Sequence, residues 1–193
     1  MKPLILASSS PRRKELLQQI GFQFSIRTSE TDERLEPDWT PQDAVLHLSK
    51  KKAEAVFTLH PDAVVIGADT IVVIDDVILG KPSNRQSAKR MLTQLSGTNH
   101  QVLTGVTIIS DTTKTSFFTQ TEVYMYDLTE QEIEQYIDSG EPFDKAGSYG
   151  IQGLGATLVK EIKGDYYSVM GLPVAETARR LQPFSIYPML KRT

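Results

Sequence analysis

The sequence of 193 residues contains no cysteine. Without thiols the chain can hold neither a disulfide framework nor a cysteine-ligated zinc ion, and it has no thiolate nucleophile; this composition is compatible with a reducing compartment. Long apolar runs are also missing. The run nearest the N-terminus spans only Leu4 to Ala7, too short for a signal peptide or a membrane span. We therefore expect a cytoplasmic protein with no membrane partner.

Strong charge of either sign is lacking too, since the formal net charge is only -3. Such a chain has no general attraction for nucleic acid, and it shows no basic stripe with interleaved aromatic residues, so we expect no nucleic-acid partner. The sequence has no Walker loop and no Gly-x-Ser-x-Gly elbow, which disfavours P-loop phosphoryl transfer and serine-hydrolase chemistry. Its length suits a single domain over residues 1–193, built of two lobes.

The most informative stretch lies near the N-terminus. Leu4 to Ala7 predicts a short buried strand, and Ser-Ser-Ser-Pro at 8–11 supplies a capping serine and a first-turn proline for a helix. That helix carries Arg12, Arg13 and Lys14 in its first turn, where each exposed cation costs roughly 0.3–1 kcal/mol against the helix dipole. Hydroxyls, free N–H groups and guanidinium groups converge there, which favours an anion site, specifically for a phosphate chain. The alternative is a solvated basic helix end.

Asp69 marks a second unusual stretch. Residues 63–74 are rich in β-branched side chains and predict a strand buried on both faces, interrupted by Gly-Ala-Asp-Thr at 67–70. A lone ionised carboxylate in such a setting costs several kcal/mol, so Asp69 must be paired, hydrogen-bonded or bound to a metal. Gly67 and Ala68 leave room for a bend, a bulge or the close approach of a ligand. The alternative is a structural aspartate satisfied by backbone amides.

Between these stretches lie a loop and a helix that contribute further charge. Residues 28–37 are polar and mostly acidic without a helical or strand period, so they predict a surface loop, which includes Glu33. Thr-Pro-Gln-Asp at 40–43 predicts the start of a helix that continues to about Thr58 and carries three successive lysines at 50–52. We expect the carboxylates of the loop to lie near the basic start of the first helix.

The second half of the chain contains a lysine in a turn and a candidate binding loop. Lys81 lies between a glycine and a proline, a setting in which a lysine is usually solvated, and phosphate binding is the alternative. Residues 147–155 hold four of the 12 glycines. Such glycine density suits a binding loop, although the spacing is not that of a dinucleotide fingerprint. Gln152 in this loop offers a donor and an acceptor to the edge of a base.

The order of the elements predicts a mixed α/β fold. Ser83 is expected to cap a helix that ends near Leu95, and residues 102–109 and 115–126 predict two long strands. Asp-Asp at 75–76 is expected to form a turn, Thr129 to begin a helix with a capping box, and residues 156–170 to form a hairpin. The three histidines are scattered without metal-ligand spacing, so they predict no metal site. Helices separated by strands, with an antiparallel portion in the second half, place the chain in the α/β class.

Eight short motifs, in order along nearly the whole chain, resemble the Maf family of nucleotide pyrophosphatases. They are Ala-Ser-Ser-Ser-Pro-Arg-Arg at 7–13, Asp-Glu at 32–33, Lys-Lys-Ala at 51–53, Gly-Ala-Asp-Thr at 67–70, Gly-Lys-Pro at 80–82, Leu-Ser-Gly at 95–97, Asp-Lys-Ala-Gly at 144–147 and Gly-Ile-Gln-Gly at 150–153. The resemblance implies an ITPase-like α/β fold: an elongated mixed β-sheet flanked by helices, with a cleft between two lobes. It also implies cytoplasmic hydrolysis of a nucleoside triphosphate to the monophosphate and pyrophosphate with a divalent metal cation (Mg²⁺ or Mn²⁺), often by a homodimer.

The motifs are most similar to those of the branch that acts on dTTP, UTP and modified pyrimidine triphosphates. On this basis Asp69 is the expected catalytic acid, and Arg12, Thr70 and Gln152 are expected to influence substrate choice. The chemistry of their side chains makes Glu33 and Asp69 the expected metal ligands. Oxygen ligands suit such a hard cation. The expected substrate-binding residues are Ser8, Arg12, Arg13, Lys52, Thr70, Lys81 and Gln152. Because the family has been linked with septum formation, the alternative is a nucleotide-sensing regulator of cell division without significant turnover.

Overall fold

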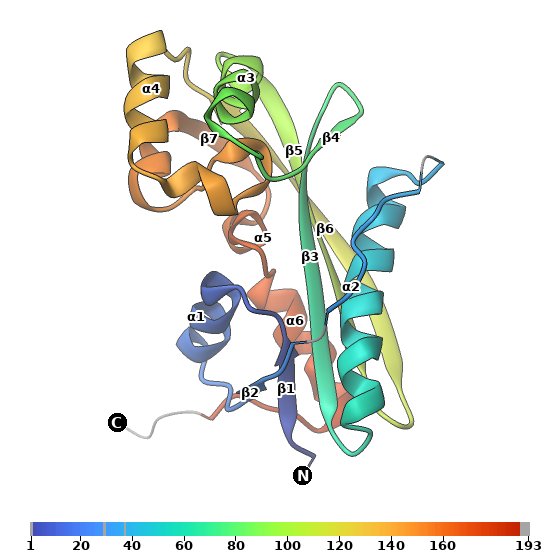
Figure 1. Ribbon diagram of the computed structural model, residues 1–193. Helices are drawn as coiled ribbons and strands as arrows, with labels where there is room; N and C mark the ends of the chain where they lie inside the picture. The colour runs from blue at the N-terminus through green and yellow to red at the C-terminus, as the bar shows by residue number, and fades with distance from the viewer. Residues whose placement is uncertain (1, 29, 37, 190–193) are drawn as a thin grey trace. The chain divides into compact units, whose positions relative to one another are not determined.

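The computed structural model describes residues 2–28, 30–36 and 38–189, and its chain divides into two compact units (Figure 1). Unit 1 comprises the chain up to Asp69, residues Thr104–Thr119 and the chain from Gly171 onward; unit 2 comprises Thr70–Leu103 and Gln120–Met170. Residues 29 and 37 of the predicted loop, and residues 1 and 190–193 of the predicted domain, lie outside the described residues. Among the described helices, none combines the length and the apolar character needed to cross a bilayer.

The chain forms a mixed sheet of seven strands, which confirms the α/β class. The strands are β1 (Leu4–Ala7), β2 (Ser25–Ile26), β3 (Val64–Ile74), β4 (Val77–Leu79), β5 (Asn99–Ile109), β6 (Lys114–Met125) and β7 (Val159–Lys163). Their order is β2-β1-β3-β5-β6-β7, and β4 pairs with β3. Strand β1 pairs in parallel with β2 and β3, so that Ala7 lies opposite Gly67, whereas the pairs β3–β4 and β6–β7 are antiparallel.

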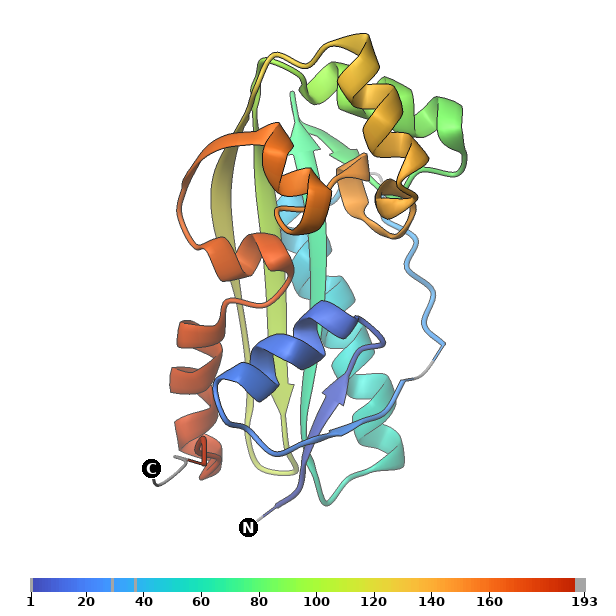
Figure 2. The same ribbon diagram turned by 90° about the vertical axis from the view of Figure 1, so that its left-hand side faces the viewer.

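Unit 1 contains the helices α1 (Pro11–Gln19), α2 (Pro41–Leu59) and α6 (Val174–Leu181). Figure 2 shows β1 leading directly into α1, as predicted. Ser10 occupies the N-cap position of α1 but its side chain makes no capping hydrogen bond, whereas α2 begins with the predicted capping box of Thr40 and Asp43. A core cluster of this unit comprises Ile5, Ala7, Ala53, Val56, Ala63, Val65 and Ile109.

Two glycines let α2 pack directly on the strands. A Cβ atom on Gly67 of β3 would lie 2.3 Å from the carbonyl oxygen of Ser49, and one on Gly105 of β5 would lie 2.3 Å from that of Val45. Only glycine permits such a close approach of two backbones. The room that the sequence predicted at Gly67 is therefore taken by α2. The strand itself is continuous through residues 67–70, so the predicted interruption is wrong.

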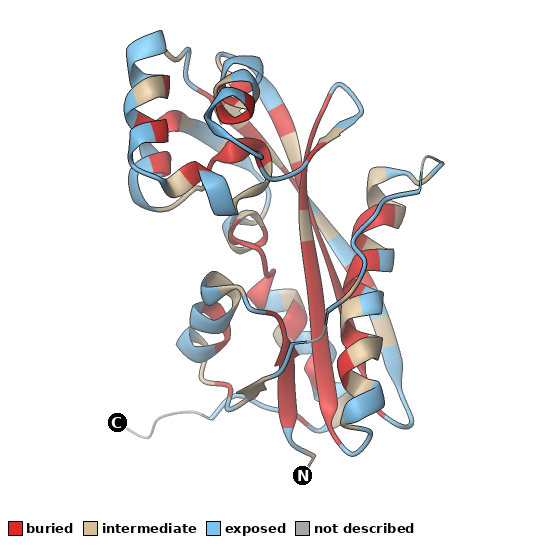
Figure 3. Ribbon diagram, viewed as in Figure 1, coloured by how far each residue is buried: buried red, intermediate tan, exposed pale blue. Residues whose placement is uncertain are grey.

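Unit 2 has its own core, visible as buried segments in Figure 3. Helices α3 (Arg85–Leu95) and α4 (Glu130–Asp138) contribute to it, and the predicted capping box at Thr129 begins α4. The N-cap of α3 is Asn84 rather than the predicted Ser83, because the Asn84 side chain accepts a hydrogen bond from the Ser87 N–H at 2.9 Å. The core cluster comprises Val72, Ile74, Leu79, Ala88, Leu92, Leu95, Val102, Val123, Met125, Ile133, Tyr136, Ile137, Tyr149 and Leu158.

The predicted hairpin over residues 156–170 is wrong. Residues 156–158 end a 3-10 helix (Gly153–Leu158), and β7 follows and pairs with β6. The second half of the segment forms the short helix α5 (Tyr166–Met170). The carboxylate of Asp165 accepts a hydrogen bond from the Tyr167 N–H at 2.8 Å, which favours a helical turn at this point. The Thr121 hydroxyl of β6 lies 2.9 Å from that of Ser168 and holds the turn from a distant part of the sequence.

Candidate active site

Lys52 of α2 forms ion pairs with both Asp69 and Glu33, the two expected metal ligands. Its Nζ atom lies 2.6 Å from Oδ1 of Asp69 and 2.9 Å from Oε1 of Glu33. The Asp69 side chain is 10% exposed and that of Lys52 is 16% exposed. The sequence predicts that Asp69 is paired, hydrogen-bonded or bound to a metal, and the structure pairs it with the ammonium group of Lys52, 17 positions earlier in the chain.

The close packing of α2 on β3 explains this geometry. Successive side chains of a strand alternate between its two faces, so Asp69 projects from the same face as Gly67, on which α2 lies. Lys52 directly precedes Ala53, whose backbone nitrogen would lie 2.6 Å from a Cβ on Gly67. Its ammonium group therefore reaches the carboxylate two residues along the strand. By the same alternation, the Thr70 side chain projects from the opposite face of β3.

Arg13 at the start of α1 is half-buried and is held by two hydrogen bonds within unit 1. Its Nε donates to the carbonyl oxygen of Gly171 at 2.7 Å, and its Nη1 donates to the hydroxyl of Ser8 at 3.2 Å. Burial lowers the pKa of Arg13, and the negative charge of Asp69 acts in the opposite direction. Because a guanidinium stays protonated in proteins, Arg13 is a fixed positive charge that interacts electrostatically with Asp69. Its neighbour Arg12 is also half-buried.

These contacts change the expectation for the variant Arg13→Ala. A basic residue in the first turn of α1 opposes the helix dipole, so the sequence alone predicts that its removal leaves stability unchanged or raises it. The structure shows that the carbonyl of Gly171 would lose its donor. We expect Arg13→Ala to lower the free energy of unfolding by about 1–3 kcal/mol, measured by urea denaturation. Lys14→Ala, which removes an exposed cation from the same turn, is the matched control. Equal midpoints for both variants would contradict this prediction.

In unit 2 the segments that carry Thr70, Lys81 and Gln152 lie close together. Gly147 of the glycine-rich loop donates its N–H to the carbonyl of Gly80 at 3.1 Å, which ties this loop to the turn before Lys81. A Cβ on Gly147 would lie 2.9 Å from a methyl of Val72, so the loop also packs on the strand just after Thr70. With a φ of +67°, Gly147 also has a backbone conformation that favours glycine.

Residues outside the predicted site hold the glycine-rich loop in place. The Glu141 carboxylate accepts hydrogen bonds from the N–H groups of Leu154, at 3.0 Å, and Gly155, at 3.4 Å. The Tyr136 hydroxyl accepts from the Gly150 N–H at 3.3 Å. Burial raises the pKa of Tyr136 to about 12, which keeps this hydroxyl neutral. Sequence reasoning missed both acceptors, because nothing in their local pattern shows what they contact.

His100 is a buried histidine beneath the same loop. Its Nε2 lies 2.6 Å from the hydroxyl of Tyr149, and the two rings meet edge to face at 5.2 Å. Burial lowers the pKa of His100 to about 4, so the imidazole is neutral at pH 7. The scattered histidines of the sequence predicted no metal site, and this contact gives His100 a packing role.

Glu33 and Asp69 fit the requirements of a hard divalent cation. Both carboxylates reach the same ammonium group, so their oxygens face a common point. Mg²⁺ is typically bound by one or two carboxylates together with waters and substrate phosphates. Within the described part of the chain, no group of three or more His, Cys, Asp or Glu side chains converges in the manner of a metal site. A pair of carboxylates therefore suits a cation that is completed by water and phosphate.

The fold and the family follow from comparison with known proteins. The structure resembles that of the Staphylococcus aureus Ham1 protein, with a TM-score of 0.50 and 13% identity over 82% of this chain and 80% of that one, which shows an ITPase-like α/β fold. The Maf-like protein family matches residues 3–184, so the chain belongs to this family.

Relatives with the name dTTP/UTP pyrophosphatase match almost end to end. One from Bacillus pumilus is 54% identical over 97% of this chain and 100% of its own length. Another, from Bacillus velezensis, is 54% identical over 96% of this chain and 98% of its own. The resemblance stated from the eight sequence motifs is thus confirmed.

Proposed function

We propose that this protein is a hydrolase that cleaves dTTP and UTP to the monophosphate and pyrophosphate. The observation that carries the proposal is that the largely buried side chain of Lys52 contacts both Asp69 and Glu33. The positive charge of Arg13 acts on the same carboxylates. Phosphoryl transfer requires carboxylates that bind a metal ion and, next to them, basic side chains that bind the phosphates. The names of the relatives support the nucleotide specificity.

Each predicted site residue has a task in this reaction, and Asp69 has two. Asp69 orients and deprotonates the water that attacks the α-phosphorus; the new P–O bond forms as the bond to the β-phosphate bridge breaks, and pyrophosphate leaves. Glu33 and Asp69 would hold Mg²⁺ or Mn²⁺, and the bound ion would neutralise phosphate charge. The phosphate-binding residues are Ser8, Arg12, Arg13, Lys52 and Lys81. Base recognition falls to Thr70 and Gln152, because a pyrimidine edge needs both donors and acceptors.

The finer expectations from the resemblance belong to the same proposal. We assign modified pyrimidine triphosphates to the substrate range, which makes the protein a house-cleaning enzyme of the nucleotide pool. We also assign it to the cytoplasm, as a homodimer, with a link to the arrest of septum formation. The motifs at 67–70 and 150–153 are the basis for the substrate range, and membership of the family is the basis for the other assignments.

A panel of nucleoside triphosphates with Mg²⁺ or Mn²⁺ tests the proposal directly. We expect dTTP and UTP to be hydrolysed fastest and pyrophosphate to be released in equal amount to the monophosphate. Separate assays for pyrophosphate and orthophosphate identify the bond that breaks. Orthophosphate as the first product would mean attack at the terminal phosphorus and would contradict the proposal.

Gln152→Ala is expected to change base preference more than overall activity. Removing one neutral hydrogen-bonding partner of the base is expected to lower the ratio of kcat/KM for UTP over ATP by about tenfold. The measurement is kcat/KM for each nucleotide of the panel, and Gln135→Ala on the exposed face of α4 is the control. An equal loss of activity on every nucleotide would show that Gln152 does not read the base.

A further inference from the structure

The loop that carries Glu33 runs alongside α2 (Figure 1). At one end of the loop, the indole of Trp39 stacks on the imidazole of His47, with the ring centroids 4.4 Å apart and an angle of 14° between the planes. Toward the other end, Nζ of Lys51 donates to the backbone carbonyl of Asp32 at 2.6 Å. These two contacts attach the loop to α2 at positions four residues apart on the helix.

Two successive lysines of α2 bind two successive residues of this loop in different ways. Lys52 binds the carboxylate of Glu33, whereas Lys51 binds the backbone just before Glu33. The Asp32 carboxylate accepts hydrogen bonds from the N–H and the Nε of Arg34, each at 3.1 Å, and so closes a local turn around Glu33. Lys51 thus fixes the position of a turn, and Glu33 lies within it.

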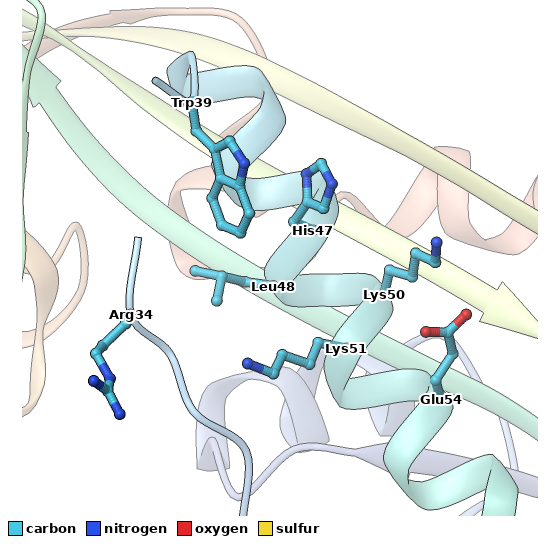
Figure 4. Close-up of a pocket in the computed structure, with 7 residues that line it drawn as sticks. All are labelled: Arg34, Trp39, His47, Leu48, Lys50, Lys51 and Glu54. Atoms are coloured by element: carbon cyan, nitrogen blue, oxygen red, sulfur yellow. The ribbon is translucent and has the colours of Figure 1, made fainter. Parts of the chain in front are cut away.

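A pocket of about 200 Å³ lies on α2 beside the loop residues Arg34 and Trp39 (Figure 4). The residues that line the pocket are Arg34, Trp39, His47, Leu48, Lys50, Lys51 and Glu54. Among these side chains only Leu48 is buried. Because little apolar surface is removed from water beneath the loop, burial does not hold it against the helix, and its position depends on the polar and stacking contacts at its ends.

We propose that Lys51 is a positioning residue, which holds the Glu33 turn against α2 so that the Glu33 carboxylate faces Lys52 and Asp69. This inference rests on the proposed function, in which Glu33 and Asp69 hold the cation. The Glu33 side chain is 57% exposed and has little packing of its own to fix it. Without the hydrogen bond from Lys51, the turn must be ordered at the moment when the cation binds, and that ordering weakens binding.

Lys50 provides a matched control for Lys51. It is also exposed, lines the same pocket and carries the same charge. Among the described residues it has no hydrogen-bond or ion-pair partner. Alanine at either position favours the helix, so both variants are expected to fold. A comparison of Lys50→Ala with Lys51→Ala therefore separates the effect of losing the hydrogen bond to Asp32 from the effect of losing a positive charge.

The experiment combines two measurements on the wild type, Lys50→Ala, Lys51→Ala and Lys51→Arg. The first is acrylamide quenching of Trp39, the only tryptophan of the chain, which lines the pocket beside Lys51. The second is the Mg²⁺ concentration for half-maximal hydrolysis of UTP. We expect Lys51→Ala to increase the quenching constant. We also expect it to raise the Mg²⁺ concentration for half-maximal hydrolysis by about tenfold, which is the effect of losing one hydrogen bond from a charged group. Lys50→Ala is expected to match the wild type, and Lys51→Arg to restore it.

The outcomes separate this inference from the proposed function. An inactive wild type in the nucleotide panel overturns the proposed function. An active wild type with a Lys51→Ala variant that matches Lys50→Ala in either measurement overturns the positioning role alone. A higher Mg²⁺ requirement together with greater exposure of Trp39, both reversed by arginine, supports it.

Discussion

Asp69→Asn is expected to lower kcat for hydrolysis of dTTP or UTP by about 10²–10⁴-fold, the range for loss of a general base. Asparagine has the shape of aspartate but cannot take a proton from water. Its amide oxygen can still accept the hydrogen bond that Lys52 donates to Asp69 at 2.6 Å, so the packing of α2 on β3 should persist. Nucleotide binding is therefore expected to remain while turnover is lost.

Two measurements on purified Asp69→Asn check this expectation: pyrophosphate release at saturating nucleotide and calorimetric binding of a non-hydrolysable triphosphate. Asp62→Asn makes the same chemical change at an exposed position just before β3 and is the control. Unchanged hydrolysis by Asp69→Asn would remove Asp69 from the chemistry. A wild type that binds nucleotides but hydrolyses none would instead favour the nucleotide-sensing alternative.

The features that the sequence predicts correctly depend on local signals. The capping boxes at Thr40 and Thr129 satisfy N–H groups within one turn, so a short window of sequence is enough to place the starts of α2 and α4. The turn at Asp75 and Asp76, where both residues have positive φ, likewise follows from residues in direct succession. Because these contacts lie within a few residues of one another, the packing of the rest of the fold does not change them.

The features that the sequence misses depend on contacts between distant residues. The helix α5 is held by Thr121, 47 positions before Ser168, and so the residues after Asp165 do not form the expected strand. Arg13 likewise bonds to Gly171, 158 positions away, which no local pattern contains. The motifs identify the charged residues of the candidate site, but the pairing of Lys52 with Asp69 and the contact of Lys51 with Asp32 require the packed structure.

Gly67→Ala is expected to destabilise the protein by about 3 kcal/mol, the upper part of the usual range for overpacking. The added Cβ would lie 2.3 Å from the carbonyl oxygen of Ser49 and 2.6 Å from the backbone nitrogen of Ala53. These are backbone atoms of α2, so no side-chain rotation relieves the clash and the helix itself must shift. A shift of α2 also moves Lys52 away from Asp69, so hydrolysis is expected to fall as well.

Gly80→Ala is the matched control, because a Cβ at Gly80 has no atom within 4 Å and its φ is not in the left-handed region. Its free energy of unfolding is expected to stay within about 0.5 kcal/mol of the wild type, as for most exposed substitutions. Both variants add one methyl group. Urea denaturation of the two therefore separates the effect of the backbone clash from the general effect of replacing a glycine. Equal midpoints would show that α2 can move off β3 at little cost, and close packing at Gly67 would then not be what holds Lys52 at Asp69.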